Sequence, residues 1–154
     1  MESLTMTPVA RVVGGRSEPV DDNWDEVEAI IRIDGERFTP DSVAGLEAFS
    51  HIEVVYSFHL ADPEALEPGA RRPRGNPDWP MVGIFAQRGK DRPNHIGVTR
   101  CRLLGVKGLD LRVAGLDAID GTPVLDIKPH MAEFDARGEI RQPAWSSELM
   151  SGYW

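Results

Sequence analysis

The segment IEVVYSFHL, residues 52–60, carries the clearest structural pattern in the chain. Every second position in it is apolar, and these positions are Ile52, Val54, Tyr56, Phe58 and Leu60. Successive side chains of a strand point to opposite faces, so a period of two predicts a half-buried β-strand. Glu53, Ser57 and His59 interrupt the apolar run, which is too short to span a bilayer as a helix.

The same alternation recurs on both sides of this segment. It predicts strands over 27–33, 109–113 and 124–128, and further candidates are 10–13, 82–86 and 96–104. About seven short strands separated by turns are typical of an antiparallel sandwich or barrel. The expected class is therefore all-β.

Helical signals are few, because 15 Gly and 12 Pro interrupt the chain often. Asp41 or Ser42 would cap a short turn through 43–49. A C-terminal helix is expected over about 143–150, between Pro143 and the stop signal Gly152. The proline-rich segment 62–80 reads as a long ordered loop, and we expect a single domain over residues 1–154.

Composition excludes several classes of protein. Hydrophobic residues make up 41% and charged residues 27%, which argues against wholesale disorder. A net charge of −8 argues against binding nucleic acid or an anionic membrane by bulk charge. The single Cys101 excludes an internal disulfide, and the four histidines lack metal-ligand spacing, so no metal is expected. The N-terminus lacks a signal-peptide pattern, so a cytoplasmic protein with no membrane partner is expected.

A cationic loop lies within GIFAQRGKDRPNHIGVT, residues 83–99. Arg88, Lys90 and Arg92 follow an apolar stretch, and Pro93 restricts Arg92 to extended geometry. Such a loop could hold a carboxylate or phosphate, because arginine binds these groups through two parallel hydrogen bonds. The alternative interpretation is a solvated hairpin tip with ordinary surface charges.

An acidic turn lies within GLDAIDGTPVLDIKPH, residues 115–130. Asp120-Gly121 is a strong turn dipeptide, and Asp117 and Asp120 flank two residues whose backbone is partly free. Carboxylates so placed can bind hydroxyls, an amine or a cation, although an ordinary tight turn has the same pattern. His59 lies at the end of the predicted strand over 52–60. A histidine at this place is either a structural residue or a proton-transfer group.

Three motifs together resemble one known family. FAQRGKDRPNHIGVT is similar to the signature FATRSxxRPNPIGxS, LDAIDGTPVLDIKPH to LDxxDGTPxxDIKPY, and GLEAFSHIEVVYSFH to GLEAFSHLWxxFxFH, all of the TrmO/TsaA/VirR-like family. The resemblance covers residues 9–130. It implies a β-barrel methyltransferase that uses S-adenosylmethionine near the interface of a homodimer. The best-known members methylate N6 of threonylcarbamoyladenosine at position 37 of tRNA.

The resemblance also implies a set of site residues. Arg88 would contact the cofactor, with Arg92 as a second anchor for a carboxylate, and the turn 117–121 would hold the adenosine part. The expected cofactor-binding residues are Asp22, Trp24, His59, Leu60, Arg88, Arg92, Val98, Asp117, Ala118, Ile119, Asp120, Gly121 and Thr122. An acylated N6 is a poor nucleophile, so a base would assist, and the candidates are His59, Asp120 and His130.

Three functions are consistent with these residues. The first is a tRNA methyltransferase, whose phosphate contacts would come from Arg71, Arg72, Arg74, Lys90 and Arg92. The second is a methyltransferase of a small metabolite, favoured by the acidic balance and by the short sequence after the barrel. The third is a barrel that binds S-adenosylmethionine without catalysis, since a fold alone does not determine a function.

Overall fold

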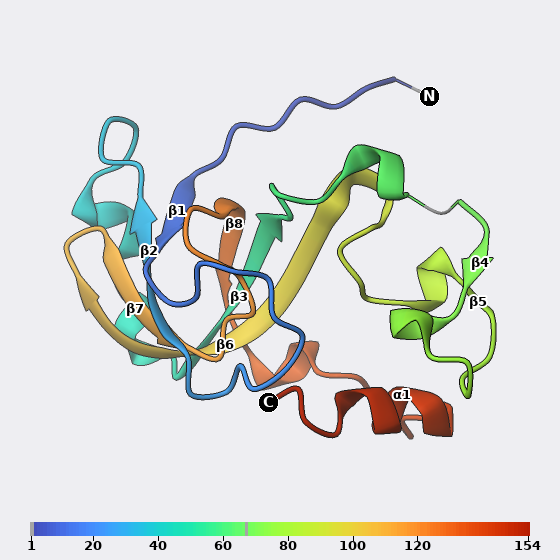
Figure 1. Ribbon diagram of the computed structural model, residues 1–154. Coiled ribbons are helices and arrows are strands. Elements are labelled where there is room, and N and C mark those ends of the chain that lie inside the picture. Colours follow the sequence, from blue (N-terminus) through green and yellow to red (C-terminus); the bar gives the residue numbers. More distant parts are fainter. Residues whose placement is uncertain (1, 67) are drawn as a thin grey trace.

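Six antiparallel strands close into a barrel in the computed structural model (Figure 1), which describes residues 2–66 and 68–154. Their order around the barrel is β1-β2-β7-β6-β3-β8, and β4 and β5 pair separately. The strands are β1 (Ala10–Val13), β2 (Glu28–Ile33), β3 (His51–Ser57), β4 (Ala70–Arg71), β5 (Val82–Gly83), β6 (Ile96–Lys107), β7 (Asp110–Ala114) and β8 (Pro123–Pro129). The predicted all-β class and antiparallel barrel are confirmed, with six barrel strands where about seven were expected.

The alternating segment forms β3 and supplies the centre of the core. Ile52, Val54 and Tyr56 point inward and are at most 2% exposed. Tyr56 also explains a glycine on the neighbouring strand, because a Cβ at Gly97 would lie 2.6 Å from its ring. The strand ends at Ser57, earlier than predicted, because the amide of His59 turns back to the carbonyl of Ser57 at 2.8 Å. Leu60 is therefore 64% exposed.

The long strand β6 closes the barrel by serving two neighbours. Its first part, from Ile96 to Arg102, pairs with β3, and its second part, from Arg102 to Lys107, pairs with β7. The register shifts between Leu103 and Gly105. A bulge of this kind bends a strand and increases its twist, which brings the two halves of the sheet together.

The structure corrects two further local predictions. The expected strand over 82–86 stops at Gly83, because the side chain of Gln87 donates to the carbonyl of Val82 at 2.9 Å and a 3-10 turn follows. The expected turn through 43–49 is two 3-10 turns separated at Gly45, whose φ is 84°. The 3-10 turns span Pro40–Val43, Leu46–Ala48, Pro63–Ala65, Pro73–Gly75, Ile84–Ala86, Pro93–His95 and Ala132–Phe134.

The C-terminal helix α1 spans Ala144–Met150, against the expected range of about 143–150. It lies outside the barrel, and the C-terminus returns to the loop that joins β1 to β2 (Figure 1). The proline-rich segment contacts both the loop between β1 and β2 and the helix α1. Arg74 donates to both carboxylate oxygens of Asp22, at 2.8 and 3.1 Å, and Trp79 Nε1 donates to Glu148 at 2.8 Å. Within the described ranges, no helix is long and apolar enough to cross a bilayer.

Candidate ligand-binding site

The end of the barrel where β3 finishes gathers the chemistry that the sequence singled out. Ile96, the first residue of β6, is paired with Ser57, and Val124 of β8 is paired with Tyr56. The cationic loop 87–95 leads into β6 and the turn 115–121 leads into β8. Both therefore open at the same barrel end, which we call the β3-end mouth.

The segment 115–121 forms main-chain hydrogen bonds at both of its ends, whereas the amides in its middle have no acceptor among the described residues. Gly115 donates to the carbonyl of Val27 at 3.1 Å, Asp120 to that of Arg16 at 2.7 Å, and Gly121 to that of Val12 at 2.9 Å. Between them, the main-chain amides of residues 116–119 donate to no acceptor among the described residues. A stretch of fixed, unused donors is suited to the polar edge of a planar ligand.

The carboxylate of Asp117 is oriented by three hydroxyl groups. Tyr56 of β3 donates to Oδ1 at 2.9 Å, Thr99 of β6 donates to the same oxygen, and Tyr153 near the C-terminus donates to Oδ2. Tyr56 and Thr99 are buried and Asp117 is half-buried. Charged hydrogen bonds are stronger than neutral ones, so this cluster fixes the segment across the mouth.

These contacts change the titration of the two tyrosines. Burial, together with the charge of Asp117, raises the pKa of Tyr56 well above its ordinary value. Burial and the same carboxylate raise the pKa of Tyr153, although Arg88 and Arg74 act in the opposite direction. Ionisation of either phenol is unfavourable, because it would place a second negative charge beside Asp117 in a partly buried site.

Two cations of the loop 87–95 are available to an anion. Arg88 donates to the carbonyl of Val98 at 2.8 Å, and Arg92 donates to that of Gln87 at 2.8 Å. Neither guanidinium forms an ion pair with a carboxylate in the part of the chain that the structure describes. Lys90 instead pairs with Asp91 at 2.7 Å.

Asp91 forms ion pairs with two cations, Lys90 and Arg71, so neither is left unpaired for an anionic ligand. Arg71 lies 3.4 Å from Oδ2 of Asp91, whereas Lys90 contacts Oδ1. Burial alone would raise the pKa of Asp91, but the hydrogen bonds and charges of Lys90 and Arg71 hold it below its ordinary value. The loop thus offers Arg88 and Arg92 to a ligand, two of its three predicted cations.

His59 and the turn Asp120-Gly121 meet at the β3-end mouth. A Cβ at Gly121 would lie 3.7 Å from Nε2 of His59, and one oxygen of Asp120 accepts from the amide of Gly14 at 2.8 Å. Both His59 and Asp120 are exposed. Leu60 and Val98 are also exposed, whereas Thr122 is buried.

His130 does not join this group within one chain. Its amide donates to the carbonyl of His51 at 3.0 Å, which places it at the opposite end of β3. A six-residue step along a strand covers about 20 Å. Its ring nitrogen instead lies 3.5 Å from Asp135. Antiparallel pairing of β8 with β3 is the physical reason, because the two ends of β8 lie at opposite ends of the barrel.

The N-terminal loop offers less to a ligand than expected. The carboxylate of Asp22 is occupied by Arg74. Trp24 is 3% exposed, its ring nitrogen donates to the carbonyl of Val20 at 3.0 Å, and the guanidinium of Arg16 lies 4.5 Å from its ring centre. These two side chains therefore shape the loop around the β3-end mouth, and as folded neither presents a free group.

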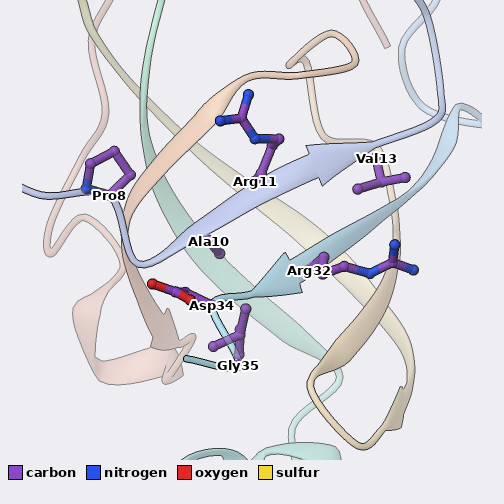
Figure 2. A pocket seen from close by; sticks show the side chains of 8 residues that line it. Pro8, Ala10, Arg11, Val13, Arg32, Asp34 and Gly35 are labelled. Atoms are coloured by element: carbon purple, nitrogen blue, oxygen red, sulfur yellow. The ribbon is translucent and has the colours of Figure 1, made fainter. Parts of the chain in front are cut away.

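A cavity of about 500 Å³ lies elsewhere, beside the outward side chains of β1 and β2 (Figure 2). Arg11 and Arg32 project from these neighbouring strands in Figure 2. Arg32 is paired with Asp110 at 2.8 Å, and Arg11 donates to the carbonyl of Gly121 at 3.2 Å. Arg11 thus supports the turn of the β3-end mouth from outside.

Sequence reasoning missed the hydroxyl groups that organise the site. Tyr56 was assigned to the core by its alternation, Thr99 closes the motif FAQRGKDRPNHIGVT but was given no role, and Tyr153 lies outside all three motifs. Their partner is Asp117, 61 residues from Tyr56 and 36 from Tyr153 along the chain. No local sequence signal reports contacts at such separations.

The closed barrel presents, at one mouth, arginines and amides that have no acceptor among the described residues, which makes this mouth a candidate site for a small ligand. The family model of the tRNA-methyltransferase O N-terminal domain matches residues 17–136. The chain belongs to this family, which confirms the resemblance carried by its motifs.

Curated relatives and solved structures agree. The chain is 40% identical over 119 residues to the tRNA (adenine(37)-N6)-methyltransferase of Escherichia coli, covering 71% of this chain and 49% of the relative. It is 43% identical over 98 residues to a probable S-adenosyl-L-methionine-binding protein of Pyrococcus abyssi, covering 62% and 50%. A crystal structure of TrmO from Pseudomonas aeruginosa superposes with a TM-score of 0.74 at 27% identity, covering 91% of this chain and 61% of that one. The match thus spans half or less of these two curated relatives.

The two tyrosines yield a titration prediction. They are the complete tyrosine content of the chain, so the tyrosinate absorbance reports this site alone. An ordinary tyrosine titrates near about pH 10. We expect no tyrosinate at that pH in the folded protein, and ionisation together with unfolding at higher pH. Because the folded pKa is raised, the stabilisation is complete below the unfolded pKa and is lost as pH rises above it.

The control for this titration is the same chain in denaturant, where both phenols should titrate normally. One tyrosine that ionises near its ordinary pKa while the barrel stays folded would contradict the hydrogen-bonded cluster around Asp117.

Proposed function

We propose that this chain is an S-adenosylmethionine-dependent methyltransferase acting on N6 of threonylcarbamoyladenosine-37 in tRNA. We further propose that it works as a single-domain, cytoplasmic homodimer. Names of the relatives from Escherichia coli and Pyrococcus abyssi support the activity and the cofactor. Because the chain covers only part of those proteins, the substrate rests on its own residues as well.

The proposal rests on two features at one mouth: main-chain amides without an acceptor, and a guanidinium, that of Arg88, without a carboxylate partner among the described residues. The amides of 116–119 can donate to ring nitrogens of an adenine, and Arg88 can bind the carboxylate of an amino acid. S-adenosylmethionine has both groups and, when bound, supplies a methyl group on a positively charged sulfur. The donor set of the chain therefore fits this cofactor.

The role of the chain in methyl transfer is mainly alignment. An in-line displacement requires the nucleophile, the methyl carbon and the leaving sulfur to lie in one line, and fixed geometry supplies much of the rate. Arg88 would bind one end of the cofactor and segment 116–119 the other. Asp117, itself held by three hydroxyls, keeps that segment in place.

Within one chain, the candidate bases that remove the N6 proton of the acceptor are His59 and Asp120. Both are exposed at the β3-end mouth, and the amide of Gly14 fixes one oxygen of Asp120 so that the other faces away from that contact. A positioned base contributes about 10²–10⁴-fold to such a step. His130 could serve only if a second subunit brought it to this mouth.

Exposed apolar side chains near the mouth support the homodimer. Leu60 follows His59 and is 64% exposed, and Phe85 precedes the cationic loop and is 81% exposed. Val98, whose carbonyl accepts from Arg88, is 38% exposed. Apolar groups of this size are stabilised when a partner covers them.

A small metabolite is the second candidate acceptor, and the charge distribution favours it. Of the five cations expected to contact phosphates, Arg71, Lys90 and Arg74 are already paired with carboxylates. Arg72 and Arg92 remain, on a chain with a net charge of −8. An extended phosphate contact would need more free cations than these two.

Substitution of the candidate bases tests the chemistry. His59→Asn or Asp120→Asn should lower turnover by about 10²-fold or more while leaving the affinity for S-adenosylhomocysteine within about threefold, because a base acts in the transition state. Calorimetry and single-turnover rates measure the two effects. His51→Asn, at the other end of the same strand, is the matched control.

Unchanged turnover in both variants would remove these residues as bases. A loss confined to His130→Asn would assign the base to the opposite end of β3 and contradict the single-chain arrangement.

The acceptor is tested by mass spectrometry of tRNA nucleosides from cells with and without this chain. We expect N6-methylated threonylcarbamoyladenosine to disappear when the chain is deleted and to return with the unchanged chain but not with the Asp120→Asn variant. An unchanged nucleoside profile would contradict the tRNA assignment and favour the metabolite.

A further inference from the structure

The last residues of the chain return to the β3-end mouth from outside the family segment. The family model ends at residue 136, whereas the contacts come from 152 and 153. The amide of Asn23 donates to the carbonyl of Gly152 at 2.9 Å, and the amide of Trp24 donates to that of Tyr153 at 2.8 Å. The C-terminal tail thus forms a short ladder with the loop between β1 and β2 (Figure 1).

The side chain of Tyr153 extends this ladder into the mouth. Its hydroxyl donates to Oδ2 of Asp117, the oxygen that neither Tyr56 nor Thr99 uses. Without Tyr153, that oxygen would have no donor among the described residues. Removing a partner from a half-buried carboxylate frees its orientation and leaves a desolvation cost.

Two further contacts link the proline-rich segment to α1 and to the loop between β1 and β2. Trp79 of the proline-rich segment donates to Glu148 on α1 at 2.8 Å, and Arg74 of the same segment pairs with Asp22 at 2.8 Å. Arg74 has a φ of 50°, a left-handed conformation that is costly for arginine and persists where the surroundings require it. The tail, the loop and the proline-rich segment are therefore fastened to one another around Tyr153.

We propose that Tyr153 is a positioning residue for the ligand site: by holding Asp117 and the 22–24 loop, it keeps the amides of 116–119 in their binding orientation. This role rests on the proposed function, because the ligand that uses those amides is S-adenosylmethionine. Tyr153 touches the carboxylate that supports the donors and acts through it. The binding site of this chain then extends beyond the residues that the family model matches.

The alternative role for the tail is the opposite one. A segment that lies across a mouth can cover it, so that the ligand must displace Tyr153 before binding. The two roles predict changes of opposite sign when the hydroxyl is removed, because a positioning group strengthens binding and a covering group weakens it.

Tyr153→Phe separates these roles, since it removes the hydroxyl and keeps the ring packed. We expect S-adenosylhomocysteine, titrated into the full chain by calorimetry, to bind about tenfold more weakly, as for loss of a hydrogen bond to a charged group. The KM for S-adenosylmethionine should rise by a similar factor, with kcat changed less than about twofold. Ser151→Ala, which removes a hydroxyl bonded within the tail to Glu148, should change neither quantity.

Amide hydrogen exchange supplies a readout that does not depend on ligand. Tyr153→Phe should speed exchange at Asn23 and Trp24, whose amides pair with the tail, while the urea midpoint of the barrel falls only slightly. A large drop in that midpoint with unchanged affinity for S-adenosylhomocysteine would overturn the positioning role and leave a purely structural one.

The remaining outcomes are also decisive. Tighter binding by Tyr153→Phe would overturn the proposal in favour of a covering tail. Failure of the unchanged chain to bind S-adenosylhomocysteine would overturn the proposed function, and the positioning role with it. Binding by the unchanged chain and equal binding by the variant would overturn the positioning role alone.

Discussion

The carboxylate of Asp117, held by the hydroxyls of Tyr56, Thr99 and Tyr153, is the contact on which the functional end of this molecule depends. A half-buried charge is tolerated when hydrogen bonds replace its water. Here the replacement comes from two core strands and the C-terminal tail. The consequence is a rigid crossing of the barrel mouth by residues 115–121, with amides that no described residue uses.

Rigidity at this place suits the proposed methyl transfer, because such a reaction depends more on alignment than on acid or base strength. The closed barrel provides it: the end of β3, the start of β6 and the start of β8 are adjacent in the sheet, so their loops share one mouth. Arg88 donates to the carbonyl of Val98 on β6, which fixes its guanidinium beside the start of that strand. The order of the strands in the barrel therefore brings the residues of the candidate site together.

Much of this arrangement could be predicted from the sequence, for a physical reason. Period-two alternation reports which side chains a sheet buries, so 10–13, all of 28–33 and most of 123–129 were placed correctly. The family motifs indicated that Arg88, His59 and Asp120-Gly121 belong together. Turn chemistry was harder: a side-chain bond from Gln87 ends β5 after Gly83, and a main-chain bond ends β3 at Ser57.

Contacts between distant segments were beyond local patterns. Trp24 was expected to face a cofactor, but the fold buries its ring beneath Arg16. His130 follows a family motif directly, yet antiparallel pairing carries it to the opposite end of the barrel. Tyr153 has no motif, and its importance follows entirely from where the chain returns. Topology, rather than spacing along the sequence, decides these three cases.

On the proposed function, segment 116–119 is the ligand-binding edge of the barrel. The most direct measurement is the change in backbone amide NMR signals of the full chain on titration with S-adenosylhomocysteine. We expect the largest saturable shifts at Leu116, Asp117, Ala118 and Ile119, with smaller ones around Arg88 and Val98. Shifts confined to the outer surface of β1 and β2, or no saturable shift at the β3-end mouth, would contradict it.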